Sequence, residues 1–346
     1  MIRAAILQGF DWSGRARRRE VWAYLVFVVL LLVATAAAEI WIAAGSPKAP
    51  RFFCLLAAIL LVPMISLCVR RLHDRGHAGG WLVLALVPVA GWLCVLYLLL
   101  APTDSRADAP DTPLALRLIG GLVVAAVVLL FACRAFWAPY WIPSGSMKPT
   151  LLAGDYMIAR FVNADDLMRG NVVVFRAAAT GTTHTARLIG LPGDRVQMRA
   201  GRIVLNDAVV VQAESVPFAE IYAPQGPSHS LPRCGNAPVG AGGQCITQRL
   251  KETLPDGATY DVLDIMQGMS SDDTAVFAVP QAAYLVLGDN RDDSLDSRFS
   301  QNVGGIGFVA ADDMIGRADR VVISAAGSTF WAVWSWRAGR FWMALP

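Results

Sequence analysis

Four apolar stretches, at 21–44, 52–69, 81–100 and 118–135, do most to limit what this chain can fold into. Each stretch approaches the roughly 20 residues that a membrane-spanning helix requires. Hydrophobic residues make up 55% of the 346 residues, whereas charged residues make up only 16%. We therefore predict a membrane-embedded part joined to a globular part.

The residues from 142 onward follow a different pattern, in which short alternating or β-branched runs are separated by glycine, proline and Asn-Asp turns. These runs lie at 171–175, 202–205, 209–212 and 284–287. Such a pattern predicts a mainly β domain, with Asn206 and Asp207 at a hairpin tip. A run rich in proline and aspartate at 101–112 indicates a linker. The predicted parts are a multi-helix membrane domain with its linker at 1–112, an anchor helix at 113–141 and a β-rich domain at 142–346.

The formal net charge is only +3, and the arginines cluster beside apolar stretches, at 15–19 and 70–75. Such clusters are typical of loops on the cytoplasmic side of a membrane. This distribution favours membrane lipid as a partner and gives no reason to expect nucleic acid. The sequence has no spacing typical of a metal site, and we expect no metal and no cofactor.

A Ser-Gly-Ser-Met turn follows the last apolar stretch. Ser146 stands beside Gly145 and between Pro143 and Pro149, which indicates a stiff, exposed turn rather than a helix interior. A hydroxyl on such a turn is accessible to a substrate carbonyl, so Ser146 is the candidate nucleophile. An ordinary Ser/Pro/Gly connector is the alternative.

Four segments of the chain follow one another in a fixed order. They are PSGSMKPTL at 143–151, GDYMIAR at 154–160, ARLIGLPGDRV at 186–196 and GDNRDDSLDSRF at 288–299, with weaker similarities in RLKETL at 249–254 and GRADRVV at 316–322. In this order they resemble bacterial type I signal peptidases, the membrane-bound serine peptidases of family S26 that remove signal peptides from exported proteins. The resemblance implies a helical transmembrane module followed by a mainly β, extracytoplasmic catalytic domain of the signal peptidase type.

The resemblance also implies a general base at position 186, where the family has a lysine and this chain has Ala186. A methyl group cannot accept a proton. The chain has three lysines, Lys48, Lys148 and Lys251, and none is an obvious substitute. Lys148 is two residues from Ser146 on a tight turn, which makes folding back onto that hydroxyl awkward.

His184 is a tentative base, because side chains two apart on a strand share a face and stand about 6.6 Å apart along it. Histidine has a reference pKa near ~6.5 and accepts a proton readily at neutral pH. Related eukaryotic signal peptidases use a histidine, but directly before the arginine rather than three residues before it. Two other interpretations stay open: His184 only starts a strand, or Ala186 is an engineered substitution that silences the enzyme.

The other site residues are assigned by the resemblance. The amide of Ser146 and the hydroxyl of Ser144 would form an oxyanion hole, in which loss of one donor typically costs ~10² to 10³ in rate. Ser294 would orient the base, and an ion pair of Asp296 with Arg298 would hold the last motif in place. The further supporting residues are Arg187, after the base position, and Asp289, Asn290 and Arg291, which would build the surrounding turn.

Cys234 and Cys245 bracket a Gly/Pro-rich loop, and an oxidising periplasm would allow them to form a disulfide. Two free thiols are the alternative. Aromatic residues gather at 136–141 and at 331–342. These clusters could dock the β domain onto lipid or pack inside its core.

The amino-terminal part resembles an uncharacterised bacterial inner-membrane domain family through GRARRREVW at 14–22 and RRLHDRGHAGGW at 70–81. With both arginine clusters in the cytoplasm, four crossings would return the β domain there, although signal peptides are removed on the other side. Pro88 and Gly91 suggest that 81–100 bends and re-enters. We expect three crossings and this re-entrant segment; four crossings with an outside amino terminus are the alternative.

Two functions follow as hypotheses. The first is a type I signal peptidase of the bacterial inner membrane, with its catalytic domain on the periplasmic side, that cleaves exported preproteins after small residues. The second is a catalytically silent homologue, natural or engineered, that binds preproteins or acts as a membrane scaffold. Ala186 is the position on which the two hypotheses differ.

Overall fold

The computed structural model describes residues 2–7, 12, 14–43, 51–86, 88–102, 114–226, 228–327 and 332–346. The chain divides into two compact units, a helical unit that ends at Phe136 and a β-rich unit, Trp137–Pro346. The predicted linker lies outside the described residues from position 103 onward, as does the predicted boundary at 112.

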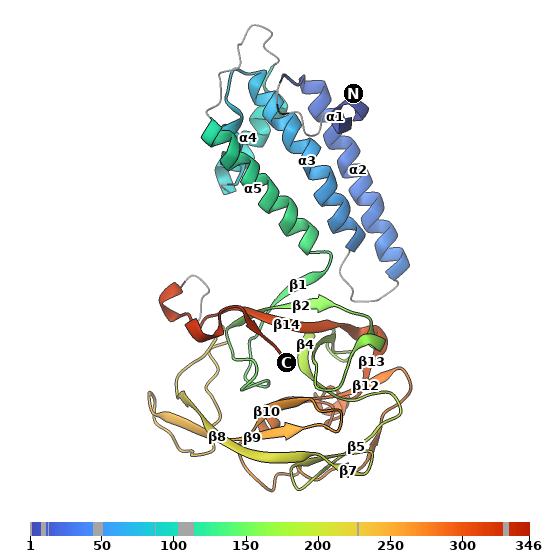
Figure 1. The fold of residues 1–346 in the computed structure, drawn as a ribbon, viewed down its shortest axis with the longest axis vertical. Coiled ribbons are helices and arrows are strands. Elements are labelled where there is room, and N and C mark those ends of the chain that lie inside the picture. The colour runs from blue at the N-terminus through green and yellow to red at the C-terminus, as the bar shows by residue number, and fades with distance from the viewer. Residues whose placement is uncertain are drawn as a thin grey trace. The chain divides into compact units, whose positions relative to one another are not determined.

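The helical unit follows the four apolar stretches (Figure 1). Its described helices are α1 Ile2–Leu7, α2 Arg18–Ala43, α3 Arg51–His73, the 3-10 helix η1 Gly79–Leu86, α4 Pro88–Leu100 and α5 Leu114–Cys133. Among the described residues, two segments are long and apolar enough to cross a membrane, Arg18–Glu39 in α2 and Phe53–His73 in α3. Their composition and length meet the requirement for a spanning helix.

The apolar stretch at 81–100 is divided between two helices of different kinds. The 3-10 helix η1 holds its first part, and α4 begins at Pro88. Proline suits the first turn of a helix, because the N–H that it lacks would have no partner inside the helix there. Gly91 lies within α4 and does not interrupt it. The irregularity that the sequence predicts therefore lies in η1 and at the start of α4, and not at Gly91.

Buried polar groups connect the helices of this unit. The Tyr24 hydroxyl on α2 donates to Leu60 O on α3 at 3.1 Å. Arg71, at the end of α3, is fully buried, pairs with Asp74 and donates from Nε to Leu98 O on α4 at 3.1 Å. The arginine-rich loop therefore includes a residue that holds two helix ends together.

The described strands of the β-rich unit form three antiparallel sheets. The largest sheet has, in spatial order, β1 Trp137–Trp141, β2 Asp155–Phe161, β14 Met314–Ser324, β3 Val172–Arg176, β4 Thr183–Gly190, β12 Ala283–Leu287 and β13 Val309–Ala310, with β15 Met343–Ala344 paired to β14. The second sheet has β10 Thr259–Asp264, β9 Gln244–Thr253 and β8 Val211–Ile221. The third has β11 Phe277–Ala278, β5 Arg195–Arg199, β6 Arg202–Leu205 and β7 Ala208–Val209.

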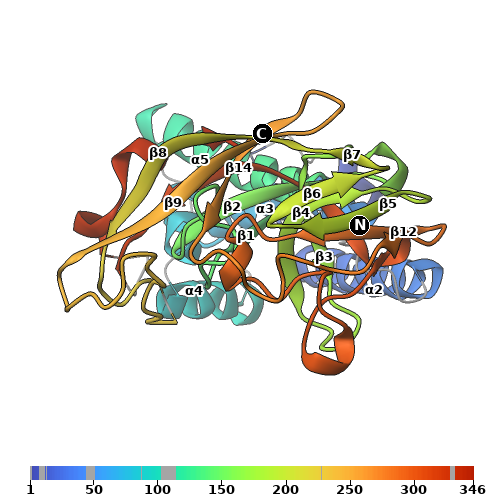
Figure 2. The same ribbon diagram turned by 90° about the horizontal axis from the view of Figure 1, so that it is seen from below.

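Tight turns and short 3-10 helices connect these strands. Asn206 and Asp207 have φ angles of 49° and 67° and join β6 to β7, as a two-residue hairpin turn requires, so the predicted hairpin tip is confirmed. The short helices are η2 Ala164–Asp166, η3 Arg291–Asp293, η4 Gln301–Val303, η5 Ala311–Asp313, η6 Val333–Ser335 and η7 Ala338–Arg340. The long strands β8 and β9 lie side by side in both ribbon views (Figure 2).

One hydrophobic core joins the three sheets. Ile189 on β4 and Leu287 on β12 pack in one cluster with Val196 on β5, Leu205 on β6 and Val262 on β10. The alternating strand pattern places these side chains inward. The mainly β architecture predicted for this part of the chain is confirmed, and the shared core holds β4 and β12, which carry the candidate site, in fixed positions.

The β-rich unit begins before residue 142. Strand β1, Trp137–Trp141, pairs antiparallel with β2, with Trp137 opposite Arg160. Residues 137–141, which the sequence predicts to belong to the anchor helix at 113–141, are therefore part of the largest sheet. An aromatic-rich segment suits an edge strand as well as a membrane interface, so its composition does not distinguish the two.

Candidate active site

The turn that carries Ser146 follows β1 directly. We call residues 143–149 the serine turn. The Ser144 and Ser146 hydroxyl oxygens are 3.2 Å apart, with Ser144 exposed and Ser146 half-buried. The Lys148 amide donates to Gly145 O at 3.1 Å and closes the turn. Met147 is fully buried and anchors the turn in the domain. The predicted nucleophile is therefore on an ordered, accessible turn.

The segment Gly288 to Phe299 follows β12 and lies against the serine turn. The Asn290 amide donates to Ser146 O at 2.9 Å, and Asn290 Nδ2 donates to Gly145 O at 3.0 Å. A Cβ atom at Gly288 would overlap the Ser294 side chain and would lie 2.8 Å from Ser146 O. Glycine is therefore required at 288 for this close approach. The structure brings Ser294 and Ser146, predicted to act together, to the same glycine.

Arg187 and Asp289 form a fully buried ion pair between β4 and this segment. Arg187 Nε is 2.6 Å from Asp289 Oδ1, and Nη2 is 2.5 Å from Oδ2. The Thr150 hydroxyl, just after the serine turn, donates to Asp289 Oδ2 at 2.5 Å. Burial alone would lower the pKa of Arg187, but the charge and hydrogen bond of Asp289 outweigh burial and raise it. Arg187 therefore stays charged, and the pair joins three segments.

Asp296 and Arg298 form the ion pair expected from the resemblance. Arg298 Nε is 2.9 Å from Asp296 Oδ1, and Nη2 is 2.9 Å from Oδ2. Both side chains are buried. The Gly288 amide donates to Asp296 Oδ2 at 3.0 Å. This bidentate pair therefore fixes the glycine at which Ser294 and Ser146 meet.

A further ion pair behind the site was not predicted from the sequence. Arg291 Nη1 and Nη2 are 2.8 and 2.5 Å from the two carboxylate oxygens of Glu252 on β9. Glu252 is fully buried. Burial alone would raise its pKa, but Arg291 outweighs burial and lowers it. The weak RLKETL similarity at 249–254 contains Glu252 and was the one signal for this contact.

Ala186 is buried on β4, opposite Val173 on β3. It precedes Arg187, whose side chain binds Asp289. Strand pairing therefore places the position of the family lysine within the sheet that carries the supporting ion pair. The methyl group has no proton-accepting atom, so the base implied by the resemblance is missing at this position.

His184 lies near the start of β4, opposite Phe175 on β3, and its ring stacks on the Phe175 ring with centroids 6.2 Å apart. Its Nε2 is 2.9 Å from the Thr182 hydroxyl. In the part of the chain that the structure describes, the polar partner of this imidazole is Thr182 and not Ser146. Partial burial lowers the pKa of His184, so the ring is neutral at pH 7.

Lys148 is buried within the serine turn, but its ammonium group is bound elsewhere. Nζ lies 2.7 and 2.8 Å from the carboxylate oxygens of Glu220 and 2.9 Å from Gln225 Oε1. Among the described residues, the hydrogen-bond partners of this ammonium group are therefore Glu220 and Gln225 and not Ser146. This contact connects residues 72 positions apart and was not predicted from the sequence.

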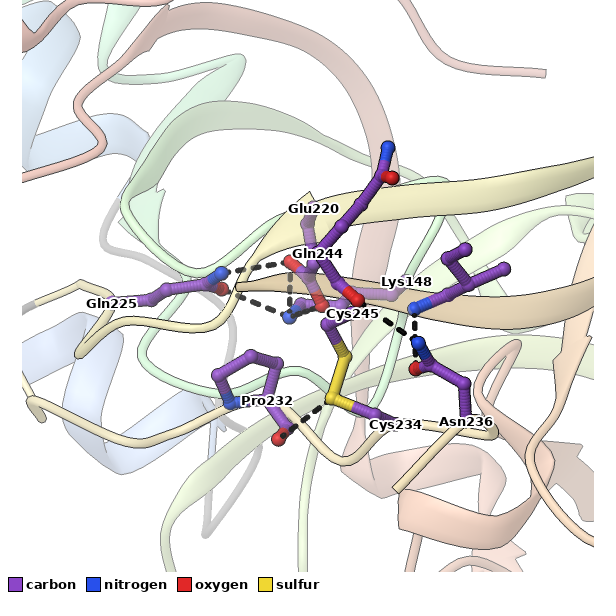
Figure 3. The surroundings of a disulfide bond; sticks show 9 residues. Lys148, Glu220, Gln225, Pro232, Cys234, Asn236, Gln244 and Cys245 are labelled. Atoms are coloured by element: carbon purple, nitrogen blue, oxygen red, sulfur yellow. Dashed lines mark hydrogen bonds and ion pairs between the residues drawn. A yellow bond between two sulfur atoms is a disulfide. The ribbon is translucent and has the colours of Figure 1, made fainter. Parts of the chain in front are cut away.

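Cys234 and Cys245 form a disulfide, with Cα atoms 5.1 Å apart (Figure 3). Cys245 lies at the start of β9, and Glu220 lies opposite it on β8. Figure 3 shows Lys148, Glu220 and Gln225 beside the bridge. The disulfide therefore closes a loop next to the residues that bind Lys148.

Two family models match the chain. Residues 115–323 match the family described as signal peptidase, peptidase S26. Residues 9–109 match a family described as a protein of unknown function, DUF805. The first match contains the serine turn, β4 and the segment from Gly288 to Phe299.

Similar proteins include the signal peptidase I of Rickettsia typhi, which is 30% identical over 222 residues, or 56% of this chain and 74% of the relative. The signal peptidase I of Rickettsia bellii (strain OSU 85-389) is 30% identical over 239 residues, or 61% of this chain and 72% of the relative. A solved signal peptidase I from Enterococcus faecalis V583 aligns at 22% identity with a TM-score of 0.24, over 44% of this chain and 96% of that chain. The family match spans more than half of the sequence, and the chain belongs to the signal peptidase family, peptidase S26.

Proposed function

We propose that this chain is a signal peptidase I type serine endopeptidase that cleaves signal peptides from exported preproteins, with Ser146 as its nucleophile. The family consists of membrane-anchored, serine-type hydrolases that act on preproteins with signal peptides. The observation that carries the proposal is the hydrogen bond from the Asn290 amide to Ser146 O at 2.9 Å, which joins the two motifs in one site.

The proposed reaction begins with attack of Ser146 Oγ on the scissile carbonyl. The Ser146 amide and the Ser144 hydroxyl would stabilise the negative charge that develops on the carbonyl oxygen. A base must take the Ser146 proton and return it to the leaving amine. By the family resemblance, Ser294 would orient the base at residue 186. The ion pairs of Arg187 with Asp289 and of Asp296 with Arg298 hold the surrounding backbone. Ala186 leaves the proton transfer without its usual acceptor.

A catalytically silent homologue is the second candidate. Ala186 favours it, and so do the partners of the two other candidate bases, since His184 contacts Thr182 and Lys148 binds Glu220. Such a protein would bind a preprotein at an intact serine turn without cutting it, or would act as a membrane scaffold.

The proposed protein is multi-pass in the bacterial inner membrane, with a membrane domain at 1–112, an anchor helix after it, and the β-rich unit from Trp137 onward on the periplasmic side. The Cys234–Cys245 disulfide supports an oxidising compartment. Exposed tryptophan side chains support lipid as a partner of the β-rich unit, since indole rings favour the membrane interface. They include Trp141, Trp334 and Trp342.

Cleavage of a model preprotein by the purified full chain in detergent tests the proposal. The matched variants are Ser146→Ala, His184→Ala and Ala186→Lys. We expect Ala186→Lys to increase cleavage by at least ~10²-fold, because general base catalysis contributes about 10² to 10⁴ in rate. Ser146→Ala in the same background should abolish cleavage.

The pattern of cleavage distinguishes the candidates. Activity of the unaltered chain that is lost in both Ser146→Ala and His184→Ala means a serine endopeptidase with a displaced histidine base. Activity only with Ala186→Lys means a complete site silenced at one residue. Absence of cleavage in every variant, with a preprotein that another signal peptidase cuts, would overturn the endopeptidase proposal.

A further inference from the structure

The serine turn has a second attachment, on the side of Lys148. The Lys148 side chain is only 4% exposed, and Glu220, Gln225 and Lys148 form a closed hydrogen-bonded set (Figure 3). Gln225 accepts from Lys148 Nζ at 2.9 Å and donates from Nε2 to Glu220 Oε2 at 2.8 Å. Both oxygens of Glu220 face the ammonium group, so the charge of Lys148 is fully compensated.

Glu220 is itself held firmly. It lies near the end of β8, directly opposite Cys245 on β9, and Cys245 is bonded to Cys234. Beyond β8, the Tyr222 amide donates to Gly243 O at 2.8 Å, and the Gly242 amide donates back to Tyr222 O at 2.9 Å. These bonds close the base of the β8–β9 connection, residues 222–243, and limit the positions that Glu220 can take.

The same connection contacts the two halves of the site. The Ser228 hydroxyl donates to Pro143 O, at the start of the serine turn, at 2.6 Å. Arg233, next to Cys234, donates to Asp292 O and lies 3.7 Å from the Asp293 carboxylate. The β8–β9 connection therefore contacts the serine turn and the segment after β12, which are the two elements that meet at Ser146.

The Lys148 side chain runs along the residue that precedes Ser146. A Cβ atom at Gly145 would lie 3.2 Å from Lys148 Cε and 3.4 Å from Asp293 Oδ2. The Lys148 amide also donates to Gly145 O. A shift of the Lys148 side chain would therefore displace the Gly145–Ser146 peptide, which contains the amide assigned to the oxyanion hole.

We propose that Glu220 is a positioning residue for Ser146. Through the ion pair of Glu220 with Lys148, the disulfide-closed β8–β9 connection holds the serine turn in its reactive geometry. The inference rests on the proposed function of that turn. Removing the Glu220 charge would leave the buried Lys148 ammonium group without its hydrogen-bonded carboxylate. It would then shift toward the nearby Asp293 carboxylate or toward water. A displacement of about 1 Å at a reacting group can cost about 10²-fold in rate.

Kinetics in the Ala186→Lys background test the proposal, with Asp207→Asn as the control, because Asp207 forms an exposed ion pair with Arg195. We expect Glu220→Gln to lower kcat by about 10-fold to 100-fold with KM changed less than twofold. Adding Lys148→Met to Glu220→Gln should cause no further loss, because both act through one contact. A kcat within twofold of the control, a rise in KM alone, or additive losses would overturn the proposal.

Hydrogen exchange of the full chain separates failure of this inference from failure of the proposed function, since it needs no cleavage. Glu220→Gln should speed exchange in 144–151 at least about tenfold and leave 195–205, in β5 and β6, unchanged. If Ala186→Lys does not cleave but exchange in 144–151 is faster, the proposed function is wrong and the positioning role stands. Unchanged exchange in 144–151 overturns the positioning role.

Discussion

The carboxyl group of Asp264 lies at the end of β10, behind the segment that carries Asn290. Burial, the nearby carboxylates of Asp292 and Asp272, and a hydrogen bond with Asp292 raise its pKa from 3.8 to about 6, although Arg291 opposes the shift. Between pH 4 and pH 6 the carboxyl group therefore keeps its proton in the folded state, whereas it is ionised in the unfolded chain. The free energy of unfolding falls as pH rises through this range, and above pH 6 the folded state carries the whole energetic penalty of the buried negative charge.

We predict that Asp264→Asn increases the free energy of unfolding by about 1–2 kcal/mol at pH 7.5, a value reduced for the partial exposure of the side chain. The gain should shrink toward zero near pH 4, where the wild-type carboxyl is protonated when folded and largely protonated when unfolded. Thermal unfolding of both proteins at several pH values measures this difference. An equal gain at every pH would exclude titration of Asp264 as its cause.

At the scale of elements, the site depends on ion pairs that join segments far apart in the sequence. Asp289 connects the segment after β12 to Arg187 on β4 and to Thr150 after the serine turn. Residues 187 and 289 are 102 positions apart. Because both side chains are fully buried, loss of either partner leaves the other charge without water or a counterion.

Asp289→Ala should therefore lower the free energy of unfolding by about 3–5 kcal/mol, the usual effect of breaking a buried pair. Asp207→Asn is the control, since it removes an acidic partner of arginine at the surface, keeps a side chain that tolerates the left-handed backbone of the turn, and should change stability by less than about 1 kcal/mol. Chemical denaturation of the purified chain gives both values. Equal effects of the two substitutions would show that the buried pair does not stabilise the β-rich unit.

At the scale of the whole molecule, the number of crossings determines on which side Ser146 lies. The helical unit has two described segments suited to span a membrane and an irregular segment made of η1 and α4. The three crossings and cytoplasmic amino terminus that we propose would place the β-rich unit outside and keep the arginine-rich segment at 70–75 inside.

A reporter that is active only outside the cytoplasm should be inactive when fused after Gly76 and active when fused after Pro346. The physical reason is that arginines beside a spanning helix resist translocation. Activity after Gly76 would instead indicate four crossings with an outside amino terminus. A reporter active only in the cytoplasm, fused at the same two positions, provides the reciprocal control.

The sequence alone determined the apolar helices, the β domain and the family. Apolar runs, alternating strands and the Asn206–Asp207 turn are local patterns, because helix and strand periods and turn geometry depend on neighbouring residues. The PSGSMKPTL and GDNRDDSLDSRF motifs pointed to Ser146 and Asp289 as candidate site residues, and the absence of a lysine at position 186 is visible in the sequence itself.

Only the tertiary structure decided which charged residues far apart in the sequence meet. The contacts Lys148–Glu220 and Arg291–Glu252 join residues 72 and 39 positions apart. The partners in such pairs cannot be predicted from their spacing in the sequence, because strand pairing and loop closure bring them together. Glu220 lies opposite Cys245 only because β8 pairs with β9 in one register. The packing of the sheets likewise decides the partners of the two alternative candidate bases. His184 contacts Thr182 and Lys148 binds Glu220, so both side chains already have polar partners other than Ser146.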